Sequence, residues 1–125
     1  MTRGRTTGAL WFSILAGPIA ALFMEQLNYM IVPAACQYHP AQLWQTLLHV
    51  VPATLVLIAI IAAVTAWRYR TGSAPASAVS HPDAGVKDGR IYFMAQLGLW
   101  LNLLSILVLL AEWIPVFMLH PCTAT

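Results

Sequence analysis

The chain has 125 residues, of which 60% are hydrophobic and only 8% are charged, and its net charge is +2. A soluble domain needs roughly three times this share of charged residues for its surface, so the composition excludes a soluble globular protein. So small a net charge also argues against the basic patch that nucleic-acid binding requires. We therefore expect membrane lipids, and no nucleic acid, among the partners.

Three apolar stretches are each longer than the roughly 20 residues with which an α-helix crosses a hydrocarbon core of about 30 Å. They cover residues 8–36, 41–67 and 91–119. Residues 71–90 are rich in Ser, Ala, Pro and Gly without an apolar period, which predicts a linker. The sequence thus predicts an all-α fold: a single membrane domain, residues 1–125, built as a bundle of three transmembrane helices.

The basic residues all lie at one side of these spans and predict the orientation of the bundle. They are Arg3, Arg5, Arg68, Arg70, Lys87 and Arg90. The segments at the other side, 37–40 and 120–125, contain neither Lys nor Arg. The positive-inside rule therefore places the N-terminus and the linker in the cytoplasm and the C-terminus in the periplasm.

Small and polar residues form stripes along the first and third spans, which predicts faces that pack against protein. The predicted helix-packing residues are Gly17, Ala21, Gly98, Asn102 and Ser105. The third span carries large apolar residues on its other faces, among them Leu99 and Leu107. Three helices bury few faces against each other, so we expect the stripe over residues 95–105 to contact a neighbouring protein.

Four polar residues interrupt the outer halves of the three spans. They are Glu25, Asn28, His49 and Glu112. Counting back from the outer helix ends at 1.5 Å per residue places the two carboxyls and the imidazole roughly 7–15 Å below the outer interface. Uncompensated charges are costly there, which predicts an inward-facing intramembrane polar cluster. It would provide hydrogen bonds between helices or to a partner; a proton path, a quinone contact and a metal site remain alternatives.

The only two cysteines, Cys36 and Cys122, follow outer helix ends, which predicts a disulfide because the outer compartment is oxidising. With His39 and His120 they form the alternative, a metal site with two thiolates and two imidazoles suited to zinc or copper. No Gly-rich phosphate loop and no nucleophile with a nearby base is recognisable, so we expect no catalytic residue.

Several short motifs, spread over all three spans, resemble those of a small three-helix membrane protein family of proteobacteria. They are Gly17-Pro18, Asn28-Tyr29 before Pro33 and Cys36, Leu48-His49, Gly98, and Glu112-x-Ile114-Pro115 leading to Pro121-Cys122. Genes of this family often lie beside those for haem–copper cytochrome oxidases and their assembly factors, and the family has no established activity. The resemblance implies a location in the bacterial inner membrane, near a respiratory complex.

The expected function is therefore that of a non-catalytic accessory subunit or assembly-related protein of a respiratory membrane complex, and the resemblance favours one of the cytochrome oxidase type. On this interpretation the isolated chain is not an enzyme and binds no cofactor itself, and haem and copper belong to the partner. Copper handling at the periplasmic face is the alternative function. A third is a small proton-coupled transporter acting as an oligomer, because three helices cannot enclose a substrate path.

Overall fold

The structure, a computed structural model, describes residues 2–37, 41–72 and 82–118, without the side chains of 2, 3, 35, 41 and 82–88. These ranges form three α-helices: α1 (Thr2–Gln37), α2 (Ala41–Gly72) and α3 (Pro82–Met118). Each contains a segment long and apolar enough to span a membrane, namely Gly4–Ala34, Gln42–Gly72 and Gly89–Met118. The predicted all-α class with three such helices is confirmed, and it indicates a multi-pass membrane protein.

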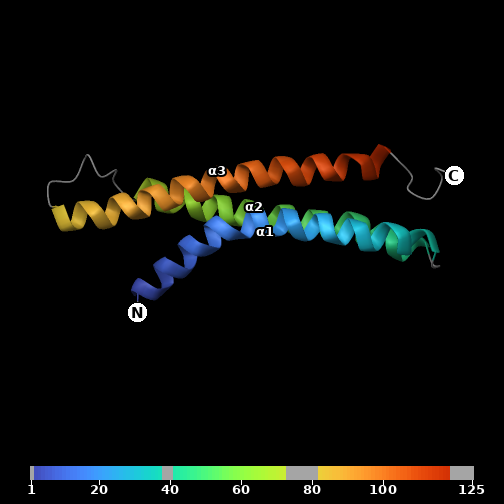
Figure 1. Cartoon of the computed structure of the whole chain (residues 1–125), viewed down its shortest axis with the longest axis horizontal. Coiled ribbons are helices and arrows are strands. Elements are labelled where there is room, and N and C mark those ends of the chain that lie inside the picture. The colour runs from blue at the N-terminus through green and yellow to red at the C-terminus, as the bar shows by residue number, and fades with distance from the viewer. Residues whose placement is uncertain (1, 38–40, 73–81, 119–125) are drawn as a thin grey trace.

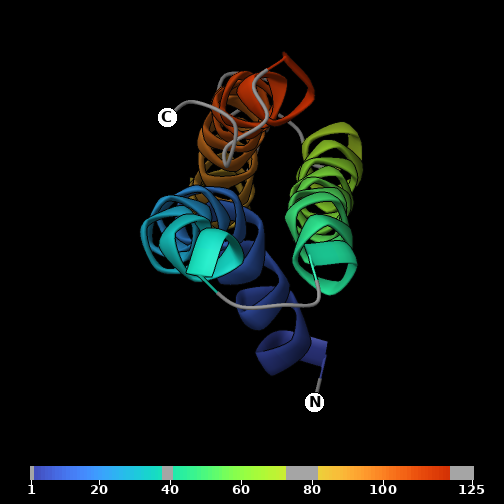
Figure 2. The same ribbon diagram turned by 90° about the vertical axis from the view of Figure 1, so that its right-hand side faces the viewer.

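The three helices run alternately up and down and pack side by side. Figure 1 shows α2 returning antiparallel to α1, and α3 running parallel to α1, so that the start of α1 and the end of α3 lie at opposite ends. Seen along the bundle in Figure 2, the helices occupy the corners of a triangle. Each helix contacts the other two.

The first helix is bent, and its N-terminal part leans away from the other two helices (Figure 1). Pro18 lies inside α1. Its ring removes one backbone hydrogen bond and clashes with the preceding turn, which is the usual cause of a sharp bend. The bend at Pro18 therefore separates the start of α1 from the rest of the bundle.

The helices extend further than the apolar stretches that predicted them. α1 begins at Thr2, α2 continues to Gly72, and α3 begins at Pro82 rather than near residue 91. Proline is well tolerated at the first helical position, where its missing N–H group has no partner to lose. Residues 82–90 of the predicted linker are thus helical, because the apolar period marks where lipid begins and not where helical hydrogen bonding begins.

Small side chains fill most of the bundle interior. α2 contributes four buried alanines: Ala59, Ala62, Ala63 and Ala66. Alanine lets helix backbones approach closely, and close packing is the main attraction between helices surrounded by lipid. Leu99 of α3, expected on a lipid-facing side, is instead buried against Ala63 and Ala66, because these alanines leave room for one large side chain.

Most large apolar side chains face outward instead. Trp100, Leu107 and Phe117 of α3 are each more than 60% exposed. A soluble bundle would bury such residues, whereas a bundle in hydrocarbon loses nothing by exposing them.

Candidate functional site

The centre of the bundle holds a polar contact between α1 and α3 at Asn102, whose side chain is completely buried. Its Nδ2 group donates one hydrogen bond across to the backbone carbonyl of Ser13 in α1. It donates another to the carbonyl of Gly98, one turn earlier in α3, over 2.6 Å. We call Ser13, Gly17, Gly98, Asn102 and Ser105 the Asn102 seam.

Two glycines allow the backbones to come this close. A Cβ atom on Gly98 would lie 2.9 Å from the carbonyl oxygen of Ser13, and one on Gly17 would lie 3.1 Å from the Cα atom of Asn102. The Ser13 carbonyl oxygen and the Asn102 Cα atom belong to the backbone, which moves only if the helices separate. A Cβ atom on Gly17 would also press on the Asn102 side-chain oxygen Oδ1, which lies closer still. The two serine hydroxyls bond within their own helices, Ser13 to Leu10 and Ser105 to Leu101. Among the described side chains of the seam, Asn102 is therefore the one that donates a hydrogen bond to another helix.

The stripe on α3 over residues 95–105 is covered by the chain itself. Ala95 and Asn102 are completely buried, and Ser105 is 6% exposed. The expectation that this surface contacts a neighbouring protein is therefore wrong, because three helices arranged as a triangle can cover one another's narrow stripes. Ala21, the remaining predicted packing residue, is partly buried and packs against the core around Met24.

The four residues of the predicted polar cluster come from the same end of the bundle but take different surroundings. Glu25 and His49 are exposed, whereas Asn28 and Glu112 are partly buried. One Glu112 oxygen, Oε2, is buried without a hydrogen-bond partner, and Glu25 lies near enough to interact electrostatically with this carboxyl. Among these four described side chains no hydrogen bond joins one to another.

His49 belongs to an aromatic group that links α2 to α3. The Trp113 indole N–H donates to Nδ1 of His49 over 3.3 Å. Phe117 packs against both rings in a tilted arrangement, with its ring centroid 5.0 Å from that of His49 and 5.4 Å from that of Trp113. Because Nδ1 accepts a hydrogen bond, Nε2 carries the ring proton in this pairing. Trp113 thus orients His49.

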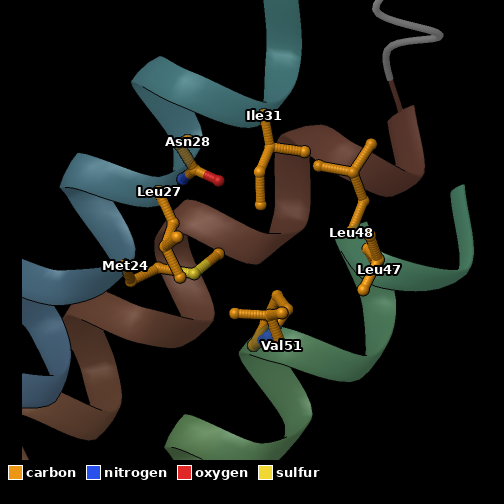
Figure 3. Close-up of a pocket in the computed structure, with 8 residues that line it drawn as sticks. Met24, Leu27, Asn28, Ile31, Leu47, Leu48 and Val51 are labelled. Atoms are coloured by element: carbon orange, nitrogen blue, oxygen red, sulfur yellow. The ribbon is translucent and has the colours of Figure 1, made fainter. Parts of the chain in front are cut away.

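Asn28 faces a narrow groove between α1 and α2 (Figure 3). The groove is lined by eight side chains from the two helices, all of them apolar except that of Asn28. They are Met24, Leu27, Asn28, Ile31, Leu47, Leu48, Val51 and Pro52. It offers no space for a water molecule, so this groove is a packing contact and not a ligand site.

No three His, Cys, Asp or Glu side chains in the described part of the chain gather as metal ligands. Of the alternative metal site, only Cys36 is described; His39, His120 and Cys122 lie outside the described residues. The disulfide between Cys36 and Cys122 therefore stays a prediction.

Alkylation separates the two interpretations of the cysteines. Without reductant we expect the purified chain to gain no mass from a maleimide, and after reduction to gain two adducts, because a disulfide protects both sulfurs. Cys36→Ser is the control, since it leaves Cys122 open to one adduct. Two adducts without reductant would contradict the disulfide, and bound zinc or copper that is lost in Cys36→Ser would favour the metal site.

Comparison with protein-family models, with curated proteins and with solved structures finds no match for this chain. The geometry of its own residues therefore carries the functional argument.

Proposed function

We propose that the chain is a non-catalytic accessory subunit or assembly-related protein of a larger membrane complex, which it contacts through the outer half of α1. The observation that carries this proposal is the exposure of Glu25 and Gln26 within a membrane-spanning segment. We call Leu22, Glu25, Gln26 and Tyr29 the α1 outer face, since their spacing places them on one side of the helix.

Lipid cannot satisfy the polar groups of this face. Glu25 precedes the end of its apolar segment at Ala34 by about 14 Å of helix, at 1.5 Å per residue. A charged side chain facing hydrocarbon costs at least about 2.5 kcal/mol, and intramembrane carboxyls accordingly face protein or water. Glu112 does not neutralise Glu25, because both are carboxyls. A polar helix of another subunit would supply the missing donor.

Tyr29 strengthens this interpretation of the α1 outer face. It is 75% exposed, one turn from Glu25. An exposed aromatic ring next to a polar group is typical of the buried centre of a protein interface. By contrast, the polar residues of the Asn102 seam are already buried within the chain, where a partner cannot reach them.

The nature of the partner rests on the motif resemblance, which favours a respiratory complex of the cytochrome oxidase type in the bacterial inner membrane. The redox cofactors would then belong to the partner. The helix arrangement supports a cytoplasmic N-terminus, since Arg5, Arg70 and Arg90 all belong to the same end of the bundle. With this orientation the α1 outer face lies in the periplasmic half of the membrane.

Replacing Glu25 with leucine is expected to release the partner. A tagged chain purified in mild detergent should retain other integral membrane proteins, and Glu25→Leu should retain about tenfold less, since losing one buried polar contact of about 1.4 kcal/mol changes an equilibrium tenfold. Leu104→Ala is the control, because Leu104 is 60% exposed on α3. Elution of the unmodified chain alone, or equal retention by both variants, would contradict the proposal.

A further inference from the structure

The bend of α1 leaves an open cleft between its first turns and the last turns of α2. The cleft measures about 340 Å³ and is lined by Ala9 of α1 and by Thr65, Arg68 and Tyr69 of α2. Figure 1 shows the start of α1 leaning away from its neighbours at this end of the bundle. The volume falls within the range of small-ligand sites, which begins at about 300 Å³.

The polar side chains that line the cleft are suited to binding a phosphate group. The Arg68 guanidinium presents a fork of N–H donors that matches phosphate oxygens. The Tyr69 hydroxyl can donate a further hydrogen bond, whereas the Thr65 hydroxyl already donates to the carbonyl of Ile61 over 2.8 Å. Arginine and a phenol beside each other in a cleft therefore offer both charge and donors to an anion.

Neither carboxylate among the described side chains lies near Arg68. Glu25, one of the two described carboxylates, lies sixteen residues beyond Ala9 in α1, which is about 24 Å along the helix, and Glu112 lies at the same end as Glu25. Only two other acidic residues, Asp83 and Asp88, accompany the six basic ones at this side, and their side chains are not described. This end of the bundle thus keeps an excess of positive charge.

The position of the cleft distinguishes a lipid from a soluble anion. Trp67, beside Arg68, is half exposed and has Arg70 stacked over its ring at 5.4 Å. Tryptophan and tyrosine concentrate at the level of the lipid head groups. Ile61 lies one turn before Thr65 and Phe12 one turn after Ala9, and both are exposed apolar side chains. From the cleft, an apolar track therefore leads toward the middle of the membrane.

We propose that this cleft binds the head group of an anionic phospholipid, with Arg68 as the ligand of its phosphate and the acyl chains lying along α1 and α2. Lipid binding is independent of the partner proposed above, because the cleft and the α1 outer face lie at opposite ends of α1. A lipid wedged here would fix the angle of the bent segment of α1.

Lipid binding by the purified chain in a neutral detergent tests this directly. The chain is titrated with phosphatidylglycerol or phosphatidylcholine, and native mass spectrometry counts the lipids that remain bound. We expect phosphatidylglycerol to bind at least tenfold more tightly, and Arg68→Gln to weaken it about tenfold, as expected for a charge-assisted contact.

Two further variants distinguish binding in this cleft from nonspecific attraction of the anionic lipid to a basic surface. Arg70→Gln removes the same charge from the same helix end but not from the cleft lining, so we expect less than about a twofold effect. Ala9→Leu fills the cleft without changing any charge and should weaken phosphatidylglycerol binding several-fold.

Three results would overturn the proposal. Equal losses in Arg68→Gln and Arg70→Gln would indicate nonspecific attraction to a basic surface, and unchanged binding in Ala9→Leu would place the lipid elsewhere. Inorganic phosphate at millimolar concentration should not bind to the lipid-free chain. Added to the chain with bound phosphatidylglycerol, it should not displace the lipid. If it displaces phosphatidylglycerol and depends on Arg68, the site takes a free phosphate instead.

Discussion

Replacing Asn102 with aspartate is expected to destabilise the bundle by about 3 kcal/mol, close to the cost of placing an aspartate at the centre of a membrane helix. The substitution keeps the shape of the side chain but removes the N–H donors. A carboxylate oxygen would then face the backbone carbonyls of Ser13 and Gly98, which now accept hydrogen bonds from Asn102. Reversible unfolding in mixed micelles, followed by circular dichroism, measures the change.

Two milder variants show whether the interhelical bond is the cause. Asn102→Ala removes the donor without adding charge, and intramembrane hydrogen bonds average about 0.6 kcal/mol with a maximum near 1.7. Ser13→Ala should be nearly neutral, because Asn102 binds the backbone of Ser13 while the hydroxyl bonds to Leu10. A large effect of Ser13→Ala, or equal stability of the Asp and Ala variants, would show that the seam is held in another way.

Residue spacing explains why the buried face of α3 follows the stripe of small and polar residues, whereas the buried face of α1 departs from it. The buried positions of α3 follow steps of three and four residues in alternation through Ala95, Gly98, Asn102, Ser105 and Leu109. This alternation stays on one face of a helix with 3.6 residues per turn. Hydropathy and spacing were therefore sufficient to identify the packing stripe of α3.

On α1 the proposed stripe ran from Gly17 through Ala21 to Glu25, in steps of four residues. Each such step turns roughly 40° past a full circle, so Glu25 lies about 80° around the helix from Gly17. The buried face instead passes from Gly17 through Ala20 to Met24. The prediction of an inward-facing Glu25 failed for this reason, and the alternating spacing could have revealed it.

Other features leave no readable signal in the sequence. The acceptor for Asn102 is a backbone carbonyl, which every residue possesses, so Ser13 could not be selected by its type. Periodicity likewise shows that a face meets protein but not which protein, and the α3 stripe proved to meet α1 and α2. The cleft at Arg68 arises only because α1 bends away from α2, a direction that the presence of Pro18 does not specify.

Adding one methyl group to Gly98 is expected to force α1 and α3 apart. The new Cβ atom of Gly98→Ala would lie 2.9 Å from a backbone oxygen of α1, and overpacking of this kind costs about 1–3 kcal/mol. Gly17→Ala should behave similarly, because its Cβ atom would press on the side-chain oxygen Oδ1 and on the Cα atom of Asn102. The free energy of unfolding in mixed micelles should therefore fall in both variants.

Gly8→Ala is the matched control, and its effect should have the opposite sign. A Cβ atom on Gly8 would have no neighbour within 4 Å, so only the helix preference of alanine over glycine, about 1 kcal/mol, should act. The double variant Gly98→Ala/Asn102→Ala should lose less stability than the two single losses together, since separating the helices already breaks the bond from Asn102 to Ser13. Strict additivity would mean that the close approach at Gly98 and the hydrogen bond of Asn102 stabilise the bundle independently.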